Sequence, residues 1–184
     1  MTVVISMLRG INVGGHNKIA MEALRDLYES LGHLNVQTHI QSGNVVFRSK
    51  AREVVALAKR IENEIETRFG FRPSVIARTV SELKSAITRN PFAARRDIDP
   101  SKLLVMFLAA EPEPEAREKL LKIKANPEEF VLDGRELYVY FPNGMGRPKL
   151  SMAQLERAVR TPATGRNWNT VTKLLSMAEK MEEL

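Results

Sequence analysis

The pattern of apolar and polar positions predicts alternating strands and helices in the first eighty residues. The run at 3–8 is apolar at nearly every position, as expected of a strand covered on both faces. A single apolar stripe then predicts a helix ending at Gly32, and a strand pair follows over 36–47. An amphipathic helix over 53–69 leads to a strand at 73–77. This order, βαββαβ, is the ferredoxin-like arrangement.

The same order of elements begins again roughly one hundred residues later. An apolar strand over 102–110 precedes a helix ending near Lys124 and a hairpin with its turn at Asp133-Gly134. Two helices complete this half, one opening at Ser151 and one introduced by residues 164–169, and no fourth strand is evident. We therefore predict an α+β protein with two ferredoxin-like (βαββαβ-type) units in tandem. The second unit is expected to be incomplete or variant, with extra C-terminal helices.

The predicted boundaries divide the chain into three parts. Residues 1–80 form the first unit, residues 81–100 a connecting helix and linker, and residues 101–184 the second unit, βαββ plus two helices. A chain of 184 residues can form one domain or two small ones, and in either case it is long enough to bury a substantial core.

Composition excludes several classes of protein. Hydrophobic residues make up 43% and charged residues 27%, which is ordinary for a globular protein. The chain has no cysteine, which rules out disulfides and thiolate chemistry and is consistent with a reducing compartment. The longest apolar run is far too short to span a bilayer, and we expect a cytoplasmic protein without membrane contact.

Charge is unevenly placed along this basic chain, which carries a net charge of +6. Residues 111–136 are rich in acidic side chains, whereas residues 145–175 contain Glu156 as their sole acidic residue. The basic residues of that second stretch are Arg147, Lys149, Arg157, Arg160, Arg166 and Lys173. A local excess of positive charge indicates either an anionic partner or a solvated basic face.

A glycine-rich loop, Arg9 to Lys18, lies between the first strand and the first helix. Gly10 and Gly15 have the spacing of a phosphate-binding loop, but His16 and Asn17 stand where that loop requires Lys and Ser or Thr. An ATPase is therefore excluded. Backbone amides of the loop could still hold an anion, and the alternative is that the glycines only form a tight turn.

Two helix starts near the C-terminus carry a related pattern. Arg147 and Lys149 precede the helix at Ser151, and Arg166 precedes a cap at Asn167 or Asn169. Cations oppose the helix dipole at such positions unless an anion occupies them. The alternative is that these long side chains extend away and pair with acidic residues.

Signals for catalysis are weak. The histidines are isolated, with His33 expected in a surface loop and His39 on the outward face of a strand. No nucleophile elbow or acid pair is evident, so no catalytic residue and no metal ligand is predicted. RNA-recognition motifs stack bases on aromatic residues of their sheet. The aromatic residues of the second half are instead expected in the core; these are Phe107, Tyr138, Tyr140 and Phe141.

Three motifs resemble a known family: Leu8 to Gly15 (LRGINVGG), Ile40 to Phe47 (IQSGNVVF) and Arg166 to Val171 (RNWNTV). Together they resemble the bacterial domain-of-unknown-function family 1697, over essentially the whole chain. The resemblance implies two ferredoxin-like or related α+β units. It implies no activity, substrate or catalytic residue. His16 and His39 stand where similar sequences often have Lys and Tyr.

We predict one ligand site at which the polar loops of both halves meet. Its residues are Arg9, Asn12, Gly14, Gly15, Asn17, Lys18, Gln41, Ser42, Asn44, Arg147, Lys149, Ser151, Arg166, Asn167, Trp168 and Asn169. The set is rich in hydrogen-bond donors, which favours a non-catalytic binding module for a phosphate-bearing ligand, either nucleic acid or a nucleotide-like anion. An enzyme acting on a small phosphorylated metabolite and a protein-interaction module remain alternatives. The residues decide neither the cofactor nor the oligomeric state.

Overall fold

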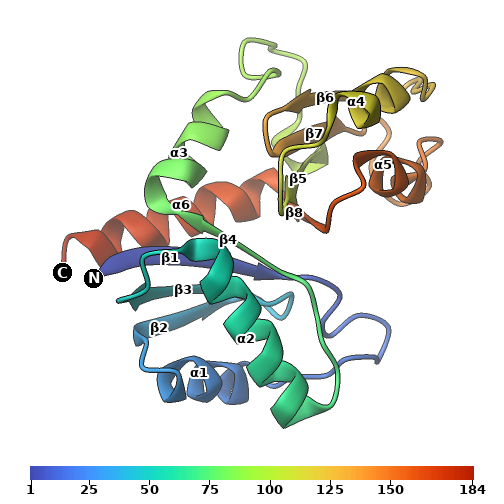
Figure 1. Ribbon diagram of the computed structural model, residues 1–184. Coiled ribbons are helices and arrows are strands. Elements are labelled where there is room, and N and C mark those ends of the chain that lie inside the picture. Colours follow the sequence, from blue (N-terminus) through green and yellow to red (C-terminus); the bar gives the residue numbers. More distant parts are fainter. The chain divides into compact units, whose positions relative to one another are not determined.

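A computed structural model describes residues 1–184, which form two compact units (Figure 1). Unit 1 comprises Met1–Ser85 together with Thr172–Leu184, and unit 2 comprises Ala86–Val171. No helix is long and apolar enough to cross a membrane.

Unit 1 contains a four-stranded antiparallel sheet in the order β2-β3-β1-β4. Its elements are β1 (Thr2–Leu8), α1 (Met21–Ser30), β2 (Leu34–His39), β3 (Asn44–Ser49), α2 (Val54–Phe69), β4 (Val75–Thr79) and the first part of α3 (Val80–Thr88). The βαββαβ order predicted for the first half is therefore confirmed.

The two faces of this sheet are covered by different elements. Successive side chains of a strand point to opposite faces, so Val4 and Leu8 of β1 pack into the core formed with α1 and α2. On the other face lies α6 (Trp168–Glu182), whose residues from Thr172 onward belong to unit 1. The Arg48 guanidinium of β3 donates to the backbone oxygen of Met181 at 2.6 Å and ties α6 to the sheet.

One histidine of unit 1 differs from its predicted place. His33 is 4% exposed, with its ring 4.7 Å from that of Phe47 and 6.1 Å from that of Tyr28. The expectation of a surface loop is wrong because Gly32, with φ +84°, turns the chain back under α1.

Unit 2 repeats the sheet of unit 1, in the order β6-β7-β5-β8. Its elements after α3 are a 3₁₀ turn (Pro100–Lys102), β5 (Leu103–Leu108), α4 (Pro114–Leu121), β6 (Glu129–Asp133), β7 (Glu136–Tyr140), α5 (Met152–Val159) and β8 (Ala163–Asn167). The predicted α+β class with two ferredoxin-like units is thus confirmed.

The second unit is nevertheless complete, and the expectation that it lacks a fourth strand is wrong. Residues 163–167, predicted as the lead into the last helix, form β8 and pair with β5. The segment has no apolar run: its central residue is Gly165, where a Cβ would lie 3.2 Å from Leu104 Cδ2, a tight contact. On the opposite face the strand buries Arg166.

The predicted linker of unit 2 is packed structure. Residues 86–99, which we call the strap, cross the face of the unit 2 sheet opposite α4 and α5. Tyr138 donates to the backbone oxygen of Ala86 at 2.6 Å, and the rings of Phe92 and Tyr140 lie 6.0 Å apart. The aromatic residues of β5 and β7 are therefore buried, as predicted, and form no open stacking surface.

The observed units differ from the predicted boundaries at both ends. The division falls within α3 and within α6, and Thr172–Leu184 joins unit 1 rather than the second half. The reason is the apolar stripe of α6: Leu174, Ala178 and Met181 are buried, and Glu179 pairs with Lys84 at 3.1 Å.

Candidate functional site

Two loops of unit 1 form a hollow of about 390 Å³, which we call the loop hollow. One is the β1–α1 loop, residues 9–20, and the other is the β2–β3 turn, residues 40–43. Its lining residues are Asn12, Gly15, Lys18, Ile19, Ala20 and Gln41. Of the predicted site residues, the structure thus brings Asn12, Gly15, Lys18 and Gln41 together.

Asn12 clamps the two loops to each other. Its Nδ2 donates to the backbone oxygens of Ile19 and Gln41, both at 2.9 Å, and its Oδ1 accepts from the Ile19 amide at 2.9 Å. Because both ends of the carboxamide are engaged, Asn12 fixes the shape of the hollow.

Left-handed backbone is concentrated in these two loops. Gly14 and Gly15 have φ values of +57° and +81°, and Gly43 in the turn has +76°. A Cβ on Gly43 would lie 2.7 Å from Ile11 Cδ1 and 2.8 Å from Leu8 Cβ, so only glycine lets the turn approach the loop this closely. Ile40, a β-branched and exposed residue, has φ 52°, an unusual conformation for its type. Loops with left-handed residues can turn successive amides toward one anion.

The hollow also meets the start of α1. Ala20 is the N-cap residue, and no side chain caps the first turn. The first amides of a helix have no partner within the helix and carry partial positive charge, so they attract an anion. Lys18 is exposed beside them and forms no ion pair, while Glu22 in the first turn of α1 is the opposing charge.

The remaining predicted residues of unit 1 support the loops. Asn17 donates to the backbone oxygen of Gly10 at 3.1 Å. Asn44 is buried and donates to His39 O and to Ser42 Oγ, both at 3.0 Å. Arg9 and Gly14 are exposed on the same loop.

The predicted residues of unit 2 fall into separate local structures. The Lys149 amide donates to the buried Glu128 carboxylate at 2.9 Å, and Ser151 caps α5 by accepting from the Gln154 amide at 3.3 Å. Arg147 is exposed before this helix. Ser151 and Gln154 have the spacing of a capping box, and the first of its two hydrogen bonds is present.

The RNWN motif is largely internal to unit 2. Arg166 is 7% exposed and donates to Thr164 Oγ1 at 2.7 Å and to Gly165 O at 2.8 Å, and burial lowers its pKa to about 10. Asn167 donates to Ser101 O at 2.7 Å and accepts from the Asn169 amide at 3.0 Å.

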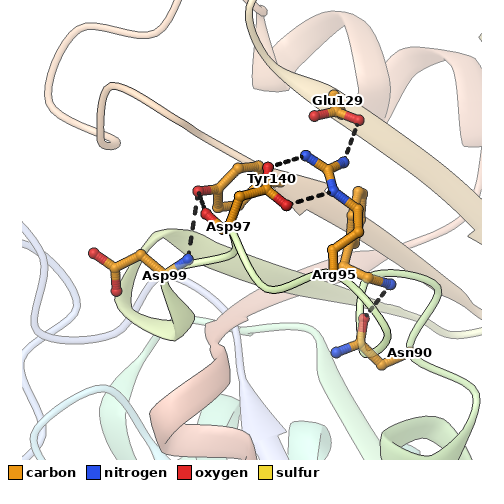
Figure 2. A network of polar contacts seen from close by, with 7 residues as sticks. Asn90, Arg95, Asp97, Asp99, Glu129 and Tyr140 are labelled. Carbon is orange, nitrogen blue, oxygen red and sulfur yellow. Dashed lines mark hydrogen bonds and ion pairs between the residues drawn. The ribbon is translucent and has the colours of Figure 1, made fainter.

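Trp168 lies in a separate hollow of unit 2, of about 340 Å³, together with residues of the strap (Figure 2 shows the neighbouring network). Because these residues belong to a different unit from the loop hollow, one site shared by both halves stays a prediction.

Chemically, the loop hollow offers donors and positive charge. No general acid and base face each other across it, and no group of three or more His, Asp or Glu side chains could hold a metal ion. Sequence analysis missed Ile19 and Ala20. The signal available for Ala20 was the absence of Ser, Thr, Asp or Asn directly before an amphipathic helix.

Comparison with known proteins supports this description of the fold. The chain is similar over 96% of its length to 98% of a chain in "The structure of conserved bacterial protein SP0830 from Streptococcus pneumoniae", with 22% identity and a TM-score of 0.72. At that identity the likeness concerns the fold alone. A comparison with curated proteins found no match. The family described as "Protein of unknown function (DUF1697)" matches residues 1–138, which is most of the chain. The protein therefore belongs to the DUF1697 family.

Proposed function

We propose that this protein is a non-catalytic binding module for a phosphate-bearing ligand, either nucleic acid or a nucleotide-like anion, and that the loop hollow receives the phosphate. One observation carries the proposal: the unpaired Lys18 and the uncapped start of α1 line the same hollow. A helix N-terminus and a lysine are a common pair of phosphate ligands. The proposal includes a cytoplasmic location, which the lack of cysteine favours.

The arrangement of Asn12 adds support. Its three hydrogen bonds hold Ile19 and Gln41 in place without a ligand, so little ordering would be needed on binding. The fixed carboxamide therefore favours a preformed site over one that assembles around its ligand.

The test is calorimetric titration with inorganic phosphate, AMP and a short single-stranded RNA, each at low and at moderate salt. Lys18→Ala should weaken binding roughly tenfold, since a charge-assisted hydrogen bond contributes at least about 1.4 kcal/mol. Lys59→Ala is the matched control, because Lys59 is an exposed lysine on α2 of the same unit.

The outcomes separate the ligand classes. Affinity that rises with RNA length and falls steeply with salt indicates nucleic acid. Salt-tolerant binding of AMP alone indicates a nucleotide-like anion. Equal losses in the Lys18 and Lys59 variants, or no heat with any probe, would refute the loop hollow as the site.

A further inference from the structure

Unit 1 has a second hollow, of about 400 Å³, between the edge strand β2 and α6. It is lined by Gln37, His39, Lys173, Met177, Lys180, Met181 and Leu184. We call it the basic hollow. None of its residues lines the loop hollow.

Helical spacing brings the two lysines to one face. Lys173 and Lys180 are seven positions apart on α6, which is about two turns. Neither forms an ion pair, and no Asp or Glu side chain lines the hollow. Glu179, next in the chain to Lys180, is engaged with Lys84 at 3.1 Å. The positive charge of this hollow is therefore not compensated by a neighbouring side chain.

His39 reaches the same hollow from the sheet. Alternation along β2 places Val36 in the core with α1 and α2, and Gln37 and His39 on the side facing α6. Burial, and secondly the charge of Lys173, lowers the pKa of His39. A bound anion would offset the repulsion between these groups.

Of the other lining residues, Met177, Met181 and Leu184 are apolar and Gln37 is polar. Met181 is 1% exposed, and Met177 is half-buried one turn from Lys173 on the same face of α6. Methionine adapts its shape to an apolar partner. A fully hydrated inorganic ion would leave this part of the hollow without a matching surface.

We propose that the basic hollow is a second ligand site, which binds a small molecule with an anionic head and an apolar group. The head lies among Lys173, Lys180 and His39, and the apolar group lies on Met177. This site does not depend on the function proposed for the loop hollow.

The test uses phenyl phosphate and octanoate as probes, because each has an anionic head and an apolar group. Inorganic phosphate, which lacks the apolar group, and octanol, which lacks the charge, are the control ligands. Binding is followed on the full chain by the imidazole NMR signal of His39, which lines this hollow and not the loop hollow. Phenyl phosphate or octanoate should bind at least tenfold more tightly than inorganic phosphate or octanol. Which of the two binds better identifies the head as phosphate or carboxylate.

Variants locate the binding. The double variant Lys173→Ala/Lys180→Ala should weaken the preferred probe at least tenfold, and Met177→Gln should weaken it while leaving inorganic phosphate unchanged. Lys59→Ala and Lys18→Ala should leave the response of the His39 signal unchanged, and the second of these distinguishes this site from the loop hollow. Equal affinity for inorganic phosphate, an unchanged double variant, or no shift of the His39 signal with any probe would overturn the proposal.

Discussion

The two units share one strand order, but different elements cover the sheet face that points away from α1 and α2 in unit 1 and from α4 and α5 in unit 2. In unit 1 that face lies against a helix, α6, whereas in unit 2 it lies under the irregular strap. The two covers differ in whether their basic side chains form ion pairs. In the strap, Arg95 is bound by Asp97 and Glu129, at 2.6 and 2.7 Å (Figure 2). On α6, Lys173 and Lys180 have no such partner.

This difference teaches that strand topology does not decide where a ligand could bind. In the cover of unit 2, Arg89 is likewise paired, with Asp133 at 2.8 Å and Glu136 at 3.0 Å. The cover of unit 1 leaves cations exposed beside an apolar surface. Two units with the same strand order can thus differ in function: in the cover of one, arginines are paired with carboxylates, whereas in the cover of the other, lysines are left without such partners.

The largest expected effect comes from breaking the cover of unit 2. Phe92 is 4% exposed, so Phe92→Ala should lower the free energy of unfolding of this unit by about 3–5 kcal/mol. Trp168 lines the same hollow and supplies a fluorescence signal for the transition. Leu121→Ala, at a residue 84% exposed, should change stability by less than about 0.5 kcal/mol. A loss below about 1 kcal/mol in the Phe92 variant would mean that the strap contributes little.

The next effect concerns the loops of unit 1. Gly43→Ala should destabilise by about 2–4 kcal/mol, because left-handed strain adds to the contact with Ile11 and Leu8. Gly70→Ala is the matched control, since Gly70 also has φ +76° but has open space around it, and it should cost about 1 kcal/mol. Hydrogen exchange of β1 to β4 amides measures both. Equal costs would show that the turn does not pack tightly on the loop.

The smallest expected effect is a pH dependence of stability that differs between the units. All three histidines belong to unit 1. Burial, and secondly the charge of Arg60, lowers the pKa of His33 from 6.5. Below about pH 6.5 the unfolded chain therefore binds more protons than the folded unit, so its free energy of unfolding falls as pH decreases, by at most about 1.4 kcal/mol per pH unit for this group.

Denaturant unfolding at pH 7, 6 and 5 checks this prediction. His33→Gln should reduce the slope for unit 1, whereas His16→Ala, at an exposed residue, should not. Unit 2 should keep the same stability over this range. A slope in unit 2 equal to that in unit 1 would contradict the assignment to histidine.

Much of the fold follows from apolar periodicity, and its failures have physical causes. β1 and β5 are apolar at nearly every position and were predicted directly. β8 was missed because its sequence, Ala163–Asn167, contains a glycine fitted to Leu104 and an arginine buried on the other face. Both residues are explained by neighbours that are distant in sequence, and a local pattern of apolar positions carries no information about such neighbours.

The candidate sites show the same division. The glycine loop was visible in the sequence, and Asn12, Gly15, Lys18 and Gln41 do line one hollow. The basic hollow was not predicted, although His39 and Lys173 had each been noticed. Their meeting depends on the return of the last helix to the first sheet, which no spacing along the chain indicates.

The return of Thr172–Leu184 to unit 1 has a consequence for biosynthesis. A ribosome releases residues in order, so the first sheet emerges well before the helix that covers its second face. Until then the apolar residues of that face have no cover, and unit 2 can fold in the interval. We therefore expect the nascent first unit to depend on chaperones until Thr172–Leu184 has emerged from the ribosome.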